Sequence, residues 1–207
     1  MTAVDQILKS RIVAIVRLAD YSRAVETARA LLAGGVTVLE FTLTGQGATE
    51  AVAATRQALG GAVCVGVGSV IHAAQAEACI DAGAEFVVTP AVRLPVIAVC
   101  VRRGVPCAAG GFTPTELLTA HEAGCELVKL FPASLGGPRY LKDVLAPLPF
   151  LKLVPTGGIS AENARDYLAA GAAAVGMGGA LINAKAIAAG EFEKLTAAAR
   201  EAVAAVK

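Results

Sequence analysis

The chain contains no tryptophan, and aromatic residues make up only 4% of its 207 residues. Charged residues are also sparse, at 17%, and the two signs nearly cancel to a formal net charge of +1. Because no cluster of lysine or arginine stands out, we expect no nucleic-acid partner and no other extended polyanion surface. Any anionic ligand must therefore be bound by a few locally placed groups.

Long apolar runs are missing as well, since a charge, a glycine or a proline breaks each run before it reaches the length of a membrane span. Residues 1–11 lack the apolar centre of a signal peptide. We therefore expect a cytoplasmic protein with no membrane partner.

Patterns of metal ligands are absent too. His72 and His121 are interpreted as surface residues, and no set of histidine and acidic residues has a metal-ligand spacing. The five cysteines are odd in number and lack paired spacings, so we interpret them as reduced core residues. They are Cys64, Cys79, Cys100, Cys107 and Cys125. We expect no metal and no cofactor.

Small and aliphatic side chains are abundant: hydrophobic residues make up 56% of the chain, and 22 residues are glycine. This composition is typical of parallel strands buried on both faces and of alanine-rich helices around them. Eight short apolar segments recur along the chain, with helical patterns between them. The predicted strands are residues 12–16, 36–42, 63–67, 86–89, 106–109, 127–131, 151–156 and 173–177.

The predicted helices share a common ending, a glycine that suits the left-handed C-terminal position. These glycines are Gly35, Gly83, Gly104, Gly124 and Gly171. Strand–helix units in series predict parallel strands with right-handed crossovers. Eight such units favour an α/β fold of the (β/α)8 TIM-barrel type, a single domain over residues 1–207, rather than an open doubly wound sheet. An amphipathic C-terminal helix at residues 191–206 is predicted to pack on the barrel wall.

Polar residues at the C-terminal strand ends are candidate site residues, because active sites of such barrels lie there. Arg17 ends the first strand, Glu40 lies in the second, and Lys129 lies in the sixth, within the apolar run 126–132. We expect all three charges inside buried strands, where a charge is costly unless it is paired or neutral. Burial lowers the pKa of a lysine, and a neutral amine is a nucleophile toward ketones. Two structural alternatives stay open: Lys129 reaches water, or it forms an interior ion pair with Glu40.

Two glycine turns follow the last two strands. Thr156-Gly157-Gly158 ends the seventh strand, and Gly178-Gly179 ends the eighth. In barrels of this kind, bare main-chain N–H groups and a helix N-terminus at these positions commonly form a phosphate site. The sequence therefore predicts an anion site at the same end of the barrel as the three charges.

Motifs on seven strands or their loops, in one order and spacing, resemble those of a known family. They are residues 12–17 (IVAIVR), 34–35 with 39–42 (GG and LEFT), 65–70 (VGVGSV), 88–90 (VTP), 112–116 (FTPTE), 128–132 (VKLFP) and 155–159 (PTGGI). The sequence is similar to the 2-keto-3-deoxy-6-phosphogluconate (KDPG) and 4-hydroxy-2-oxoglutarate aldolase family, the small class I aldolases that release pyruvate.

The resemblance implies that Lys129 forms a Schiff base with the C2 ketone of the substrate and that Glu40 transfers protons. It implies cleavage of a KDPG-like 2-keto-3-deoxy sugar acid phosphate to pyruvate and glyceraldehyde 3-phosphate, as in Entner–Doudoroff sugar metabolism, by a homotrimer. The implied substrate-binding residues are Pro90 and Phe131 at the pyruvyl part, Arg17 and Ser69 at the carboxylate, and Thr156, Gly157, Gly158, Gly178 and Gly179 at a distal phosphate.

Three positions depart from the family pattern. Thr44 stands where several members have an arginine, and Ser69 stands where a threonine is usual. Ala180 follows Gly179 near the phosphate turn, where many members supply a serine. Because the last change removes a hydroxyl group, an unphosphorylated keto acid, 4-hydroxy-2-oxoglutarate, becomes a second expected substrate, cleaved to pyruvate and glyoxylate.

Two other functions fit the residues without the resemblance. One is a phosphate-binding barrel isomerase or synthase that uses Glu40 as a base and forms no imine. The other is a catalytically silent barrel that binds a metabolite.

Overall fold

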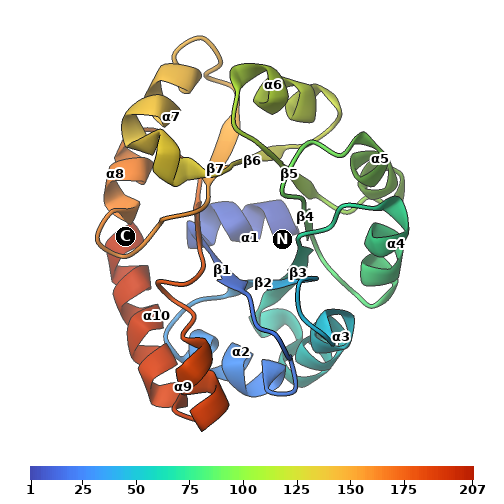
Figure 1. The fold of residues 1–207 in the computed structure, drawn as a ribbon, viewed down its shortest axis with the longest axis vertical. Helices are drawn as coiled ribbons and strands as arrows, with labels where there is room; N and C mark the ends of the chain where they lie inside the picture. Colours follow the sequence, from blue (N-terminus) through green and yellow to red (C-terminus); the bar gives the residue numbers. More distant parts are fainter.

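The computed structural model describes all residues from 1 to 207, and in it eight parallel strands form a barrel (Figure 1). The strands lie side by side in the order β7-β6-β5-β4-β3-β2-β1-β8. The β7–β8 seam is closed by a bridge between Thr156 and Gly176 and by the Ala173 N–H, which donates to the Leu153 carbonyl at 2.9 Å. The strands are β1 (Ile12–Val16), β2 (Val38–Thr42), β3 (Cys64–Gly68), β4 (Val87–Val88), β5 (Cys107–Gly111), β6 (Leu127–Leu130), β7 (Lys152–Pro155) and β8 (Val175–Met177). The predicted (β/α)8 barrel is confirmed.

Helices surround the barrel, and glycines with positive φ follow α2, α4, α5, α6 and α8 at the predicted positions. The helices are α1 (Ala3–Ser10), α2 (Ala24–Ala33), α3 (Ala48–Leu59), α4 (Ala73–Asp81), α5 (Leu94–Arg103), α6 (Pro114–Glu122), α7 (Gly137–Leu145), α8 (Ala164–Ala169), α9 (Ala184–Ala189) and α10 (Phe192–Val206). Short 3-10 helices span Gly60–Ala62 and Ala133–Leu135. None of the helices combines the length and the apolar character that crossing a membrane requires.

The strands are buried on both faces, which explains their continuous apolar runs. Outward-pointing residues such as Leu39 and Phe41 pack with the helices in a cluster of 51 buried residues. The alternate residues, such as Val38 and Leu127, point inward and form a cluster of 10 at the N-terminal end of the barrel. All five cysteines are buried, as predicted for core residues.

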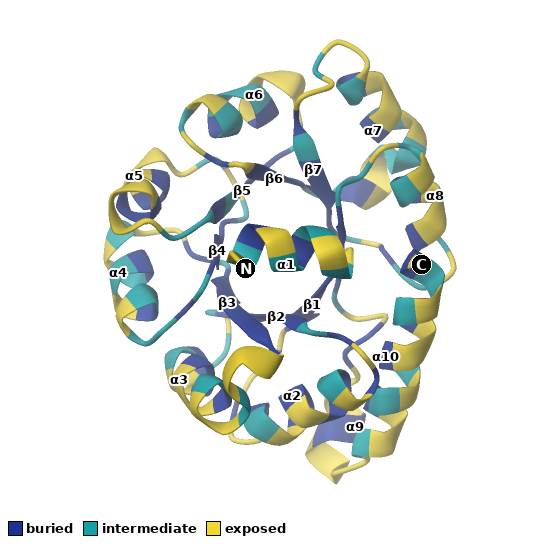
Figure 2. Ribbon diagram, turned by 180° about the vertical axis from the view of Figure 1, so that it is seen from behind, coloured by how far each residue is buried: buried dark blue, intermediate teal, exposed yellow.

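Helix α1 closes the N-terminal end of the barrel, and Figure 2 shows it in front of the strands. Its Val4 and Ile7 are buried in the inner cluster. A capping box between Thr2 and Asp5 begins the helix. This helix was not predicted, although the spacing of Val4 and Ile7 matches one face of a helix.

The helix predicted over residues 191–206 is α10, which packs along α2. Any side chain at Gly34 would overlap Ala199, so the two helices approach more closely there than larger residues allow.

The strands begin or end up to two residues away from most predicted limits, and β4 is reduced to Val87–Val88. The expectation that Arg17 lies inside a buried strand was wrong. Strand β1 ends at Val16, and Arg17 follows it as an exposed residue. Its guanidinium thus keeps its hydration, because it extends from the end of the strand at the mouth of the barrel.

Candidate active site

Lys129 and Glu40 both point into the barrel. Each lies two residues beyond a member of the inner cluster, Leu127 on β6 and Val38 on β2. Because alternate strand residues share a face, the two charged side chains form the next layer above the inner cluster. They line one small interior cavity of about 20 Å³, which Thr156 also lines.

The Lys129 side chain is almost fully buried, with the residue 6% exposed. Burial lowers the pKa of its amine; Arg17 acts in the same direction, and Glu40 opposes them. Its Nζ atom lies 4.9 Å from the centre of the Phe131 ring. The environment therefore favours the neutral, nucleophilic amine more than water does.

Glu40 is 3% exposed, and burial raises the pKa of its carboxyl group against the opposing charges of Lys129 and Arg17. No ion pair within 4.0 Å joins it to Lys129 or Arg17. The interior ion pair is thus not formed. Two ionisable groups with pKa values moved toward each other are typical of catalytic sites.

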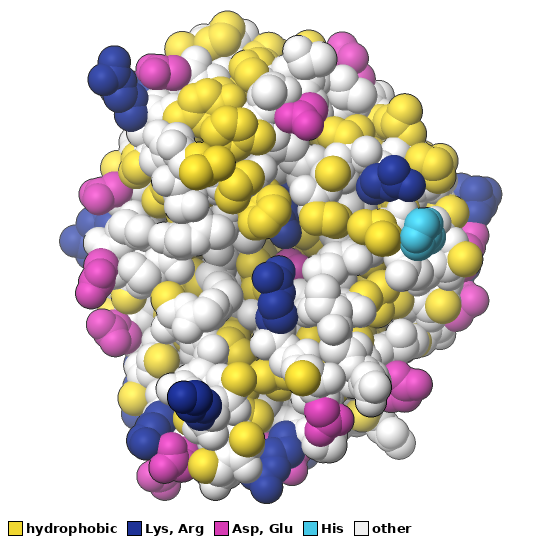
Figure 3. Space-filling model, in the orientation of Figure 1, with side chains coloured by type: hydrophobic (Ala, Val, Ile, Leu, Met, Phe, Trp, Pro, Cys, Tyr) yellow, Lys and Arg dark blue, Asp and Glu magenta, His cyan; other side chains and the backbone are white.

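A cavity of about 530 Å³ opens above this pair, at the end of the barrel opposite α1. Figure 3 shows this face, which is hollowed at its centre. Seven predicted site residues line the cavity: Arg17, Phe131, Thr156, Gly157, Gly158, Gly178 and Gly179. Thr156 also lines the small interior cavity, so it connects the wide opening to Lys129 and Glu40.

The glycine turns supply hydrogen-bond donors to the cavity. Gly157 and Gly158 adopt φ values of +93° and +76°, which glycine reaches at little cost. The N–H groups of Gly158 and Gly179 donate to no other main-chain group. Free N–H groups together with the nearby Arg17 can hold an anion.

The last two predicted residues lie at the same end of the barrel but line neither cavity. Ser69 follows β3 with a φ of +62°, a conformation that is uncommon outside glycine. Pro90 follows β4, and its main chain lies against Gly110 of β5.

Ala180, noted above beside the phosphate turn, also lines the wide cavity, and four further lining residues were not predicted as site residues: Ile15, Ile159, Ser160 and Ile182. Ser160 brings a hydroxyl group close to the glycine turn. Its N–H donates to Asn163 Oδ1 at 3.0 Å, and the Asn163 amide donates to the Gly158 carbonyl at 2.9 Å. The signal that could have found Ser160 is its position at the helix start directly after the Gly-Gly turn.

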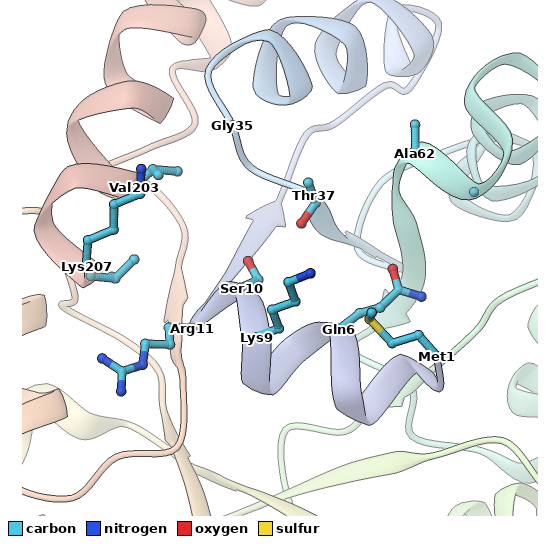
Figure 4. A pocket seen from close by; sticks show the side chains of 12 residues that line it. Met1, Gln6, Lys9, Ser10, Arg11, Gly35, Thr37, Ala62, Val203 and Lys207 are labelled. Atoms are coloured by element: carbon cyan, nitrogen blue, oxygen red, sulfur yellow. The ribbon is translucent and has the colours of Figure 1, made fainter.

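A second large cavity, of about 580 Å³, lies at the opposite end of the barrel between α1 and α10 (Figure 4). Lys9, Arg11 and Lys207 are among its lining residues. Lys9 and Lys207 lie at the C-terminal ends of the two helices, where cations complement the helix dipole.

Among the ionisable residues of the chain, no three His, Cys, Asp or Glu side chains are arranged to hold a metal ion.

A buried amine, a buried carboxyl group and a mouth of free N–H groups at the C-terminal end of a barrel define an enzyme that forms a Schiff base with a small anionic carbonyl compound. A family model described as KDPG and KHG aldolase matches residues 4–198. The chain belongs to this family, and it is a lyase, a class I aldolase that acts through a Schiff base.

Individual aldolases are also similar to this chain in sequence and structure. The 2-dehydro-3-deoxy-phosphogluconate aldolase of Treponema pallidum is 36% identical over 202 residues, which cover 97% of this chain and 96% of that protein. The KHG/KDPG aldolase of Escherichia coli is 35% identical over 208 residues, 100% of this chain and 97% of that protein. A structure of the Legionella pneumophila KDPG aldolase, with pyruvate captured as a covalent carbinolamine, aligns with a TM-score of 0.89 and 27% identity, over 96% of this chain and 97% of that one.

Proposed function

We propose that this aldolase cleaves a KDPG-like 2-keto-3-deoxy sugar acid phosphate to pyruvate and glyceraldehyde 3-phosphate, with Lys129 as its Schiff-base residue. One observation carries the proposal: Lys129 and Glu40 are both buried inside the barrel and form no direct ion pair. A structural pair would hold the ammonium in its charged form. The unpaired lysine is instead available as a neutral nucleophile.

The reaction begins when the Lys129 amine attacks the C2 ketone, and the carbinolamine loses water to give an iminium ion. When the C3–C4 bond breaks, its electron pair moves toward the positively charged nitrogen. The C4 hydroxyl gives up its proton, C4 leaves as the aldehyde, and C3 remains in an enamine. Protonation of C3 and hydrolysis of the imine then release pyruvate and regenerate the amine.

We assign these proton transfers to Glu40. Burial raises the pKa of its carboxyl group, which brings the protonated form closer to the working pH of an enzyme. A carboxyl group of this kind can accept the proton of the C4 hydroxyl and deliver one to C3.

We assign the remaining predicted residues to the other parts of the substrate. Arg17 and the Ser69 hydroxyl bind the substrate carboxylate, for which a guanidinium is well suited. Pro90 and Phe131 pack against the pyruvyl part. Thr156 lies between the two cavities, and the N–H groups of the glycine turns bind the distal phosphate.

The second candidate substrate is 4-hydroxy-2-oxoglutarate, cleaved to pyruvate and glyoxylate. Ala180 lines the wide cavity and offers a methyl group instead of a hydroxyl. This lowers the number of donors available to a phosphate, whereas a smaller distal carboxylate needs fewer of them. The ratio of kcat/KM for the two substrates decides which is preferred.

The central experiment is trapping of the imine. The protein is incubated with pyruvate, reduced with borohydride and digested, and mass spectrometry locates the adduct, which we expect on Lys129. Lys152→Met is the matched control, and the adduct on Lys129 should still form in it. Lys152 is a solvent-accessible lysine on β7 whose amine pairs with the Glu126 carboxylate at 2.6 Å. Absence of the adduct, or an adduct on another lysine, would overturn the proposed role of Lys129.

We also propose a homotrimer in the cytoplasm. Leu94, Val101, Leu135 and Phe150 are large apolar residues exposed on the surface, and covering such side chains favours association. Sedimentation equilibrium over a range of concentrations tests the assembly, and a monomer mass throughout would overturn it. Cell fractionation tests the location.

A further inference from the structure

Tyr21 lies in the loop between β1 and α2 and joins the C-terminal ends of two strands. Its ring is 5% exposed and packs edge-on against Phe41, with ring centres 5.5 Å apart. Its hydroxyl oxygen lies 2.8 Å from the carbonyl oxygen of Val16, at the end of β1, and 2.9 Å from that of Thr42, at the end of β2. It also accepts a hydrogen bond from the Thr42 N–H at 3.0 Å. One buried hydroxyl group thus holds two strand ends together.

These strand ends carry two groups of the proposed site. Val16 directly precedes Arg17, and the partner of the hydroxyl on β2 is two residues beyond Glu40. The last pair of the β1–β2 ladder joins Val16 to Phe41. Beyond that pair, the Tyr21 hydroxyl connects the two strands. This contact therefore lies next to Arg17 and two residues from Glu40.

The loop between β1 and α2, which begins with Arg17, also contacts the loop that follows β2. The Gln46 N–H donates to the Ala19 carbonyl at 2.9 Å, and the Tyr21 N–H donates to the Gln46 carbonyl at 3.3 Å. A side chain at Gly45 would overlap the carbonyl oxygen of Leu18. The two loops are thus in contact through their main chains, with Tyr21 at the centre of the contact.

We propose that Tyr21 is a positioning residue of this aldolase, whose hydroxyl group sets the separation between the Arg17 guanidinium and the Glu40 carboxyl group. The inference rests on the proposed function, in which Arg17 binds the substrate carboxylate and Glu40 transfers protons. Packing alone does not account for the hydroxyl, because a phenylalanine would fill the same volume and a buried hydroxyl is costly unless it is hydrogen-bonded.

The test compares Tyr21→Phe with Tyr140→Phe. Tyr140 donates to the Phe112 carbonyl at 2.6 Å, so both variants lose a tyrosine hydroxyl that is hydrogen-bonded to the main chain. Tyr21→Phe also removes the acceptor of the Thr42 N–H. We expect Tyr21→Phe to raise the KM for the keto acid about tenfold and to lower kcat, since small displacements of binding groups cost rates of this order or more. We expect Tyr140→Phe to keep both constants close to those of the parent protein.

A double-mutant cycle separates positioning from a general loss of stability. In an Arg17→Gln background, the effect of Tyr21→Phe on KM should disappear, because the group that it positions is gone. An equal fold-change in both backgrounds would overturn the proposal. So would unchanged kinetics in Tyr21→Phe, or a Tyr21→Phe chain that circular dichroism shows to be unfolded, which would assign the hydroxyl a purely structural role.

Borohydride trapping distinguishes this inference from the proposed function. At saturating pyruvate, the adduct on Lys129 should form in the parent protein and in Tyr21→Phe. No adduct in the parent protein would refute the proposed function together with the role of Tyr21. A normal adduct in both proteins with unchanged kinetics in Tyr21→Phe would overturn the role of Tyr21 alone.

Discussion

The carboxyl group of Glu40 lies so close to Gly68 that a side chain at position 68 would overlap its Oε1 atom. The two residues belong to neighbouring strands, β2 and β3, and both are fully or almost fully buried. The space for the proposed proton-transfer group is therefore made by the missing side chain of a glycine.

Gly68→Ala should displace the Glu40 carboxyl group and lower kcat about a hundredfold, as expected for a catalytic group moved by about 1 Å. Steady-state kinetics with the keto acid measures the effect. Gly61→Ala is the control, because a Cβ at Gly61 meets no atom within 4 Å and the residue lies at the opposite end of the barrel. A Gly68→Ala enzyme with parental kcat would show that the position of Glu40 does not limit the reaction.

Lys129→Met should abolish turnover and pyruvate trapping without weakening the fold. The substitution replaces a buried amine by an apolar side chain of similar length, so it removes a desolvation cost. We expect the free energy of unfolding to stay the same or to rise by about 1 kcal/mol. Urea unfolding measures it, and a clear decrease would mean that Lys129 contributes to stability.

The pH dependence of trapping should respond in opposite directions to the two neighbours of Lys129. Glu40 raises the pKa of the Lys129 amine, and Arg17 lowers it. Because only the neutral amine attacks the ketone, the trapping rate rises with pH through this pKa. Glu40→Gln removes a negative charge, so the midpoint of the profile should move to lower pH. Arg17→Gln removes a positive charge, so it should move to higher pH. Midpoints that shift in the same direction would contradict this electrostatic account.

Ile7→Ala should destabilise the protein by about 2–5 kcal/mol, the usual cost of deleting a buried isoleucine side chain. Ile7 is 2% exposed and seals the N-terminal end of the barrel within the inner cluster. Leu8→Ala on the same helix is the comparison, because Leu8 is only partly buried and should cost less. If the two variants lose equal free energies of unfolding, measured by heat or urea, burial of Ile7 at the N-terminal end of the barrel does not contribute specially to stability.

Much of the fold could be predicted because its signals are local. Runs such as residues 12–16 are rich in β-branched residues, and a glycine ends most helices, so the alternation of strands and helices is visible along the chain. Helix α1 was not predicted, whereas the two-residue strand β4 lies within the predicted strand 86–89. The contact of Glu40 with Gly68 and the hydrogen bonds of Tyr21 had no local signal at all.

By itself, the sequence determined which strands carry charged residues and which strand ends carry polar groups. Strand residues alternate between two faces, so Lys129 shares a face with Leu127, and the structure shows that this face is the barrel interior. The tertiary structure alone decided that Lys129 and Glu40 form no direct ion pair, that Arg17 is exposed, and that Tyr21 joins the ends of β1 and β2. These facts depend on distances between side chains on different strands, and such distances are set only when the register of the strands closes the barrel.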